Sequence, residues 1–293
     1  MNTIASTESR AAFDRQLAAL RPKLHRYCAR MVGSVIDGED VLQDAVVKAI
    51  EAFSETSRID NPKGWLFRIA HNAALDFLRR RARLSATFID EDPEMVADLS
   101  NETDARQAAA ASLRTFMALP VAQRSSVILM DVLGYSLDEI STVTDTTIPA
   151  VKAALHRGRT SLRELAARSD DTSLPVLAAA DQARLAAYVE RFNARDFDAV
   201  RDMLAGDVKL ELVARLRLNG KSEVQNYFHN YNLNPTWQFT PAIVEGRPGA
   251  LVHDPATAPY FVLLEWTTEG LIGIRDFRYA TYVTKGVQLT LLG

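Results

Sequence analysis

The stretch "YSLDEISTVTDTTIPAVKAALHRGRTSLREL", residues 135–165, decides the fold of the middle of this chain. Leu137 and Ile140 predict a short helix, and Thr147 predicts the cap of a second helix with Pro149 in its first turn. The second helix is predicted to have an apolar face and a cationic face, formed by Val151, Leu155, Gly158 and Leu162 and by Lys152, His156, Arg159 and Arg163. This pattern is typical of a helix-turn-helix whose second helix fits the major groove of DNA. An ordinary helical hairpin with a solvated basic face stays open as an alternative.

A second stretch, "GWLFRIAHNAALDFLRRRAR" at residues 64–83, combines two kinds of surface on one predicted helix. Its apolar residues recur at helical spacing and predict a buried stripe of Leu66, Ala70, Ala73 and Phe77. A second line at helical spacing carries an aromatic ring, an amide, an acid and guanidinium groups: Trp65, Arg68, Asn72, Asp76, Arg79 and Arg83. An ordinary solvated face does not explain this mixture.

Basic and acidic segments alternate along the chain, although its net charge is small. The formal net charge of −3 excludes a protein that coats nucleic acid by charge alone. Residues 63–83 nevertheless contain six bases against one acid, residues 88–104 contain seven acids and no base, and residues 147–168 contain five bases against one acid. These blocks predict two basic docking faces separated by an acidic tether.

Composition excludes several other classes. Cys28 is the single cysteine, so neither a structural disulfide nor a multi-cysteine metal site is expected. The chain has no run of eighteen apolar residues, and its first ten residues have no apolar core of a secretory signal. We therefore expect a cytoplasmic protein with no metal, no cofactor and no membrane contact.

The sequence pattern changes after Leu177, from helices alone to helices followed by strand-like runs. Two short helices are expected over residues 179–208, and a third over residues 222–231. Strand-like runs follow, with Gly, Pro and Asp between them: residues 236–246, 250–254, 258–269, 271–284 and 287–292. Helices followed by a run of antiparallel strands predict an α+β domain.

Residues 64–83 resemble regions 2.3 and 2.4 of sigma-70-type transcription initiation factors, and "DGEDVLQDAVVKAI", residues 37–50, resembles regions 2.1 and 2.2. Residues 119–162 resemble region 4. No region 3 fits between them, which is the pattern of the extracytoplasmic-function (ECF) group. The part from Ala179 onward is similar to SnoaL-like (nuclear transport factor 2-like) cone domains, with "ARDFDAVRDMLAGDVKLE", residues 194–211, as the recognisable segment.

The resemblance implies a multidomain protein with two all-α sigma domains followed by an α+β cone-shaped SnoaL-like domain. The expected boundaries are region 2 at 9–86, an acidic linker at 87–106, region 4 at 107–168, a short linker at 169–178 and the SnoaL-like domain at 179–293.

The resemblance also implies a function: directing bacterial RNA polymerase core to specific promoters, recognising and melting the −10 element with region 2 and recognising the −35 element with region 4. The residues expected at the −10 element are Arg68, Asn72, Arg79, Arg80, Arg83 and Trp65, although a tryptophan at a helix start is more often a core residue than a stacking platform. The residues expected at the −35 element are Thr147, Lys152, Ala153, His156, Arg157 and Arg159.

The expected partners are promoter DNA and the β′ clamp helices and β flap of RNA polymerase core. Asp40, Gln43 and Asp44 lie within one turn of a predicted helix, at the position where the family docks the basic clamp helices. Exposed acids on an ordinary surface helix are the alternative reading of these three residues.

The SnoaL-like domain is expected to regulate the sigma module in cis and to be no enzyme, with a small-molecule ligand left open. Its candidate pocket residues are Tyr227, Tyr231, Trp237, Phe261 and Trp266, for which core filling is the alternative. Two other functions stay open: a free-standing helix-turn-helix regulator, and a cone-domain isomerase or cyclase with a DNA-binding appendage.

Overall fold

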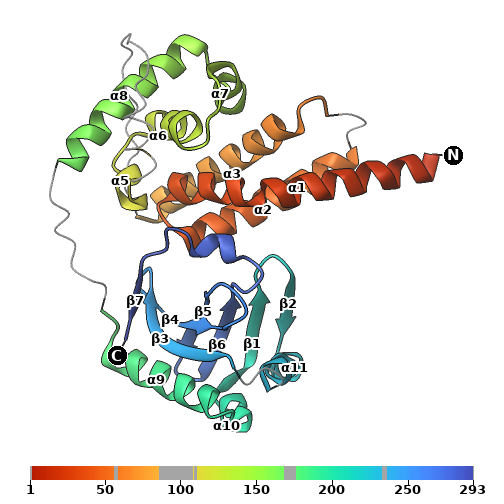
Figure 1. Ribbon diagram of the computed structural model, residues 1–293, viewed down its shortest axis with the longest axis vertical. Coiled ribbons are helices and arrows are strands. Elements are labelled where there is room, and N and C mark those ends of the chain that lie inside the picture. The colour runs from red at the N-terminus through yellow and green to blue at the C-terminus, as the bar shows by residue number, and fades with distance from the viewer. Residues whose placement is uncertain are drawn as a thin grey trace. The chain divides into compact units, whose positions relative to one another are not determined.

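The computed structural model describes residues 2–55, 59–85, 108, 111–167, 176–232 and 236–292. The chain forms two compact units, a helical unit of Met1–Asp170 and a β-rich unit of Asp171–Gly293 (Figure 1). Each unit has its own apolar core. Helical domains followed by an α+β domain are therefore confirmed as the fold class. The expected acidic linker lies outside the described residues, as does most of the short linker.

The helical unit begins with three packed helices, α1 (Asn2–Val32), α2 (Val35–Glu55) and α3 (Pro62–Ser85). Pro62 opens α3, where the missing N–H of proline costs no helical hydrogen bond. Gly38 permits the close approach of α2 to α1, because a Cβ at this position would lie 2.5 Å from the Cα of Ala29. The apolar face of α3 packs against α1 and α2.

Five shorter elements follow α3 in the described part of the helical unit: α5 (Leu113–Met117), α6 (Val121–Val127), the π-helical turn η1 (Ile128–Val132), α7 (Leu137–Thr144) and α8 (Ile148–Ala166). Pro120 separates α5 from α6, which starts directly after it. Buried side chains from α1–α3 and from α5–α8 belong to one continuous core, and Tyr27, Phe67, Phe116 and Leu155 are among them. The unit is therefore a single packed body.

A buried arginine joins the two helical groups. Arg124 of α6 donates from Nη1 to the carbonyl oxygen of Met31 in α1 at 2.5 Å, and from Nη2 to the carbonyl oxygens of Leu119 at 2.8 Å and Met117 at 3.2 Å. Burial lowers the pKa of this guanidinium to about 10, so it is still charged at neutral pH. Its hydrogen bonds satisfy carbonyl groups near helix ends that have no partner within their own helices.

The β-rich unit contains α9 (Ala179–Asn193), α10 (Phe197–Asp202) and α11 (Lys221–Asn232) together with a seven-stranded sheet. The strands are β1 (Leu204–Leu212), β2 (Leu216–Asn219), β3 (Gln238–Val244), β4 (Arg247–His253), β5 (Tyr260–Thr267), β6 (Gly270–Asp276) and β7 (Leu289–Leu291). Their order is β2-β1-β6-β5-β4-β3-β7. Apolar residues of the three helices and of one face of the sheet form the core, and Figure 1 shows the sheet curving beside the helices.

The sheet confirms one sequence expectation and contradicts another. The strands of the expected run, β3–β7, pair antiparallel as predicted. The sheet also contains a parallel pair, formed by β6 with β1, which precedes that run. Such a pair needs a crossover connection, which α11 and strands β3–β5 supply. The run expected as one strand over 271–284 stops at Asp276, whose side chain accepts the backbone N–H of Arg278 at 2.8 Å, and residues Thr281–Thr284 form the 3₁₀ turn η2.

Candidate nucleic-acid interface

The inner face of α3 is apolar and buried. Leu66, Ala70 and Ala73 lie in the core as expected, whereas Phe77 is only partly buried. Trp65 is also half-buried, and its ring lies edge-on to Phe13 with 6.2 Å between ring centroids. Packing therefore accounts for much of the Trp65 surface, and its contact with DNA stays a prediction.

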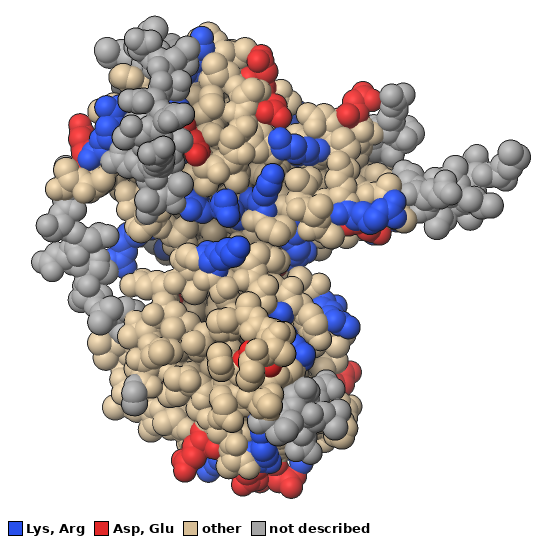
Figure 2. Space-filling model, viewed as in Figure 1, with Lys and Arg blue, Asp and Glu red and all other residues tan. Residues whose placement is uncertain are grey.

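The outer face of α3 carries five of the six side chains expected at the −10 element. All five are exposed: Arg68, Asn72, Arg79, Arg80 and Arg83. Figure 2 shows Lys and Arg side chains on the visible face of the helical unit, with acidic side chains among them. Asp76 lies 3.3 Å from the Lys48 ammonium and 3.4 Å from the Arg79 guanidinium, so it pairs with one cation on α2 and one on α3. Exposed ion pairs of this kind are weak, so they leave the guanidinium groups available to a stronger anion.

Two histidines are buried in the helical unit, His25 on α1 and His71 on α3. The Tyr27 hydroxyl and Nδ1 of His71 are hydrogen-bonded at 2.6 Å, and Nε2 of His25 donates to the carbonyl oxygen of Val35 at 2.9 Å. Burial lowers the pKa of each histidine to about 4. Both imidazoles are therefore uncharged in the folded protein at neutral pH.

Acidification is expected to destabilise the helical unit. Between pH 6.5 and about pH 4 the unfolded chain binds protons at His25 and His71 while the folded chain does not, so stability falls as the pH falls. From pH 6.5 to 5.5 the free energy of unfolding should drop by about 1 kcal/mol for each histidine, or about 2 kcal/mol in total. Urea unfolding at the two pH values, followed by circular dichroism, measures this change in the free energy of unfolding. His71→Gln, which keeps an acceptor for Tyr27 but does not titrate, should halve this slope, and an unchanged slope would contradict the account.

Helices α7 and α8 form the expected helix-turn-helix. Ser136 and Glu139 cap α7 reciprocally, and Asp145 ends it in the left-handed region at φ 55°. Thr147 caps α8 by accepting the N–H of Ala150 at 3.3 Å. At the crossing of α6 and α8 only glycine fits, since a Cβ on Gly158 would lie 2.7 Å from Cγ2 of Val127. Local capping and one close contact thus set the angle of the second helix.

The cationic face of α8 differs from the expected stripe. Thr147 and His156 are exposed, and Lys152 and Arg157 are half-exposed. Ala153 and Arg159, which were expected at the −35 element, are each 6% exposed. The expectation that these two side chains lie on the outer face is therefore wrong in this structure.

Arg159 has a structural partner that explains its burial. It donates to both carboxylate oxygens of Asp131, from Nε at 2.9 Å and from Nη2 at 2.5 Å. Asp131 comes from the π-helical turn η1, and both side chains are almost fully buried. Helical spacing puts Arg159 on the cationic line, but spacing alone does not reveal a carboxylate 28 positions away. Asp131 is thus a residue that the sequence analysis missed.

The residues expected to dock polymerase lie together on α2. Asp44 is exposed, Asp40 and Gln43 are half-buried, and all three fall within one turn. Asp44 lies 3.4 Å from Arg80 of α3. The candidate polymerase and DNA surfaces are therefore neighbours on the same body.

The five candidate pocket residues do not line one cavity. Tyr227, Tyr231 and Trp237 are buried in the core between helices and sheet, and Trp266 packs against it. Phe261 alternates with the core residues of β5 and so faces the other side of the sheet, where its ring lies 4.3 Å from that of Phe277. Core filling, the alternative reading, describes this set better.

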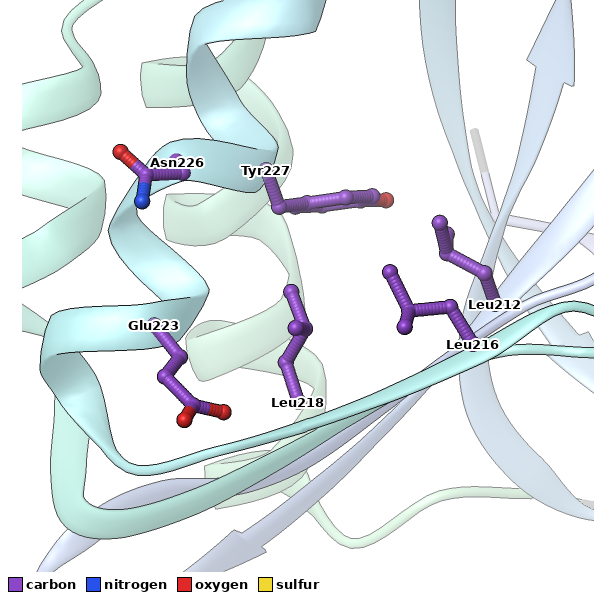
Figure 3. A pocket seen from close by; sticks show the side chains of 6 residues that line it. All are labelled: Leu212, Leu216, Leu218, Glu223, Asn226 and Tyr227. Atoms are coloured by element: carbon purple, nitrogen blue, oxygen red, sulfur yellow. The ribbon is translucent and has the colours of Figure 1, made fainter.

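Tyr227 does line a cavity of about 310 Å³ between α11 and the β1–β2 hairpin. Figure 3 shows its ring pointing from α11 toward the leucines of the hairpin. The other lining residues are Leu212, Leu216, Leu218, Glu223 and Asn226. The site is mostly apolar, with an amide and a carboxylate on the helix side.

A buried carboxylate lies behind this cavity. Asp276 accepts hydrogen bonds at Oδ2 from the hydroxyls of Tyr227 at 2.9 Å and Tyr231 at 2.7 Å, and Tyr260 lies 3.2 Å from the Tyr231 oxygen. Burial raises the pKa of Asp276, while these hydrogen bonds oppose the shift. Tyr227 therefore lines the cavity with its ring and hydrogen-bonds with its hydroxyl to Asp276 at the end of β6.

The described part of the chain contains no cluster of three or more His, Cys, Asp or Glu side chains that could hold a metal ion. Nor does any helix within it have the length and apolar character needed to cross a membrane.

Two family models match this chain. They are Sigma-70 region 2, over residues 17–84, and Sigma-70, region 4, over residues 113–162. The chain is also 33% identical over 156 residues to the ECF RNA polymerase sigma factor SigM of Mycobacterium tuberculosis, covering 53% of this chain and 78% of that protein.

Solved structures include two sigma factors. The extracytoplasmic function sigma factor SigJ of Mycobacterium tuberculosis is 20% identical, with a TM-score of 0.37, covering 89% of this chain and 95% of that one. The sigma factor RpoE of Bartonella quintana, solved with the anti-sigma factor NepR, is 25% identical with a TM-score of 0.41, covering 53% of this chain and 96% of that one.

Proposed function

Because this chain belongs to the extracytoplasmic-function group of RNA polymerase sigma factors, we propose that the outer faces of α3 and α8 are its two promoter-binding surfaces. The protein is a non-enzymatic subunit that acts with RNA polymerase core and promoter DNA in promoter-specific initiation. Its expected place in the cytoplasm follows from that partner. What remains to be assigned is which side chains carry each contact.

The proposal for α3 rests on the exposed line of guanidinium and amide groups above its apolar face. Arg68, Arg79, Arg80 and Arg83 supply bidentate donors for phosphate oxygens, and Asn72 supplies an amide for a base edge. Stacking one base on a side chain is worth about 1–3 kcal/mol, comparable to the cost of unstacking it. A surface of this kind can hold a −10 element while the duplex opens.

The proposal for α8 rests on the side chains that remain accessible beside the capped turn. These are Thr147, Lys152, His156 and Arg157. Lysine and arginine recognise guanine O6 and N7 in the major groove, and a hydroxyl at the helix start can contact phosphate. Arg159 is left out of this surface because Asp131 holds it in the interior.

Lys152→Ala distinguishes base recognition from phosphate binding. If Lys152 contacts a guanine, the variant should lose about 1–3 kcal/mol of promoter affinity and relax the preference at one position of the −35 element. Run-off transcription from promoters substituted at each −35 position measures this effect. Lys209→Ala, which removes an exposed lysine of β1, is the matched control. A uniform loss on all promoters would mark Lys152 as a phosphate contact instead.

For polymerase we propose the acidic patch of Asp40, Gln43 and Asp44 as the contact for the basic β′ clamp helices, with region 4 contacting the β flap. The supporting observation is that the three side chains share one turn of α2 beside the DNA-binding candidates. Co-purification with core enzyme separates this function from that of a free-standing regulator, which does not need polymerase.

For the β-rich unit, whose layers are consistent with a SnoaL-like domain, we propose regulation of the sigma module in cis. Its attachment by a short segment gives an effective concentration of roughly millimolar. The cavity at Tyr227 suits a small, mostly apolar ligand with one hydrogen-bonding group for Asn226 or Glu223. Equal transcription by chains ending at Arg168 and at Gly293, with and without candidate ligands, would contradict this regulation.

The experiment that tests the function as a whole is run-off transcription with purified core enzyme on genomic fragments. Transcripts that start at defined sites only when the protein is added are the expected result. Absence of any protein-dependent transcript, together with no association with core, would overturn the proposal.

A further inference from the structure

The cavity between α11 and the β1–β2 hairpin has two unlike walls. Leucines of the hairpin form one wall, and side chains of α11 form the other: Leu212, Leu216, Leu218, Glu223, Asn226 and Tyr227. The helix residues are spaced i, i+3 and i+4, so they share one face of α11. A ligand in this cavity therefore meets hydrocarbon on one side and a carboxylate, an amide and an aromatic ring on the other.

The cavity has a negative charge at its edge. Among the described residues that line it, only Glu223 is charged at neutral pH. Its Oε2 accepts the backbone N–H of Asn219 at 2.8 Å, which holds the exposed carboxylate beside the hairpin. Within the described part of the chain, no lysine or arginine forms an ion pair with Glu223. The carboxylate therefore attracts a cation and repels an anion.

The two arginines of the hairpin do not offset this charge. Arg217 donates from Nη2 to Oε1 of Glu211 at 2.9 Å. The strand register places this pair one position from the last pair of leucines, so it lies on the opposite face of the hairpin. The guanidinium carbon of Arg215 lies 4.3 Å from the centroid of the Tyr279 ring. Both arginines thus have partners outside the cavity.

The Tyr227 ring is held in place by the core behind it. Its hydroxyl lies 2.9 Å from Oδ2 of Asp276 and 3.0 Å from the hydroxyl of Tyr231, and the residue is 4% exposed. In Figure 3 the ring is seen nearly edge-on, with leucines of the hairpin on one side of its plane. The face of an aromatic ring attracts ammonium groups, and a fixed ring loses little entropy on binding. Tyr227 therefore offers a preorganised surface to a cation.

An organic ammonium ion suits these walls better than a metal ion. Calcium and magnesium ions take about six or more oxygen ligands, whereas the described walls supply the side-chain oxygens of Glu223 and Asn226. An ammonium group can donate to both residues and lie against the Tyr227 ring, while its hydrocarbon part replaces water beside the leucines. The volume of about 310 Å³ suits a small molecule.

We propose that this cavity binds a small organic ammonium ion with a compact apolar group. The inference deepens the ligand part of the proposed function, on which it rests, because it gives the charge and the chemical class of the molecule. The leucines bind the apolar group, and Glu223 with the Tyr227 ring selects the positive charge.

Three probes of similar shape test the charge preference: cyclohexylmethylamine, cyclohexylmethanol and cyclohexanecarboxylate. At neutral pH the amine is a cation, like a lysine side chain, and the acid is an anion. Ligand-observed NMR titration of the full chain gives the Kd of each probe. The amine should bind about tenfold more tightly than the alcohol, through one cation–π contact and one exposed ion pair, and the carboxylate should bind most weakly. Equal affinity for the amine and the alcohol, or tightest binding of the carboxylate, would overturn the inference.

Three variants locate the binding. Glu223→Gln keeps an acceptor for the Asn219 N–H but removes the charge, so it should lower the preference for the amine about threefold and leave the alcohol unchanged. Glu190→Gln makes the same charge change at an exposed site of α9 and should alter neither probe. Leu216→Ala, at a leucine that is 47% exposed, should weaken the amine and the alcohol alike. A full preference in Glu223→Gln, or unchanged binding of both probes to Leu216→Ala, would place the binding elsewhere and contradict the inference.

Failure of the proposed regulation would show differently, as equal transcription by chains ending at Arg168 and at Gly293. The preference for the amine is measured without transcription, so the two results are distinguishable.

Discussion

Asp131→Ala is expected to lower the free energy of unfolding of the helical unit by about 3–5 kcal/mol, although Asp131 touches no proposed ligand. The substitution leaves the Arg159 guanidinium buried without its bidentate partner. An uncompensated buried charge is among the most destabilising single changes that a protein can suffer, because the desolvation cost persists after the attraction is removed. Urea unfolding followed by circular dichroism measures the loss.

Two further variants identify the cause of this loss. Arg163→Ala removes an exposed arginine one turn further along α8 and should change stability by no more than about 0.5 kcal/mol. Asp131→Leu combined with Arg159→Met replaces the pair by apolar groups and should recover most of the loss. If Asp131→Ala were as stable as the unsubstituted chain, the structural role assigned to Arg159 would be wrong.

Arg124→Ala should cost a similar amount, about 3–5 kcal/mol. The guanidinium satisfies the carbonyl oxygens of Met31, Met117 and Leu119, and each buried acceptor left without a donor costs about 1–3 kcal/mol before water or relaxation compensates. Thermal unfolding should show a lower midpoint for the helical unit. Arg124→Lys should fall in between, because one ammonium cannot reach all three oxygens.

Arg114→Ala is the control for this prediction, since Arg114 is an exposed arginine of the neighbouring helix α5. It should leave the midpoint almost unchanged. Equal midpoints for Arg124→Ala and Arg114→Ala would show that the hydrogen bonds of Arg124 contribute little to stability.

Local patterns predicted one helix start and one apolar stripe. Thr147 with Pro149 predicted the start of the second helix of the helix-turn-helix, and α8 begins there. The reciprocal capping of α7 by Ser136 and Glu139 was not predicted. The apolar stripe of α3 could also be predicted, because a 3.6-residue period is a property of residues close together in the sequence.

Long-range partners could not be predicted in the same way. The burial of Arg159 depends on Asp131, and the pairing of Arg68 and Lys63 depends on a helix more than 70 positions away. The expected pocket failed for a related reason, since Phe261 lies on the opposite face of β5 from Tyr260 and Val262. A one-residue difference along a strand reverses the face, and aromatic composition does not fix that register.

The central claim is that α3 carries the −10 contacts of a polymerase-bound sigma factor, and one measurement tests it most directly. Run-off transcription with purified core enzyme is compared for the unsubstituted chain and for the variant Arg79→Gln, Arg80→Gln, Arg83→Gln. Loss of three phosphate contacts at about 1 kcal/mol each should reduce initiation roughly a hundredfold, with association to core retained. Arg191→Gln, Lys209→Gln, Lys221→Gln removes the same charge from exposed sites of the β-rich unit and should transcribe normally. Equal transcript yields from the two triple variants would contradict the assignment of α3 as the promoter-binding surface.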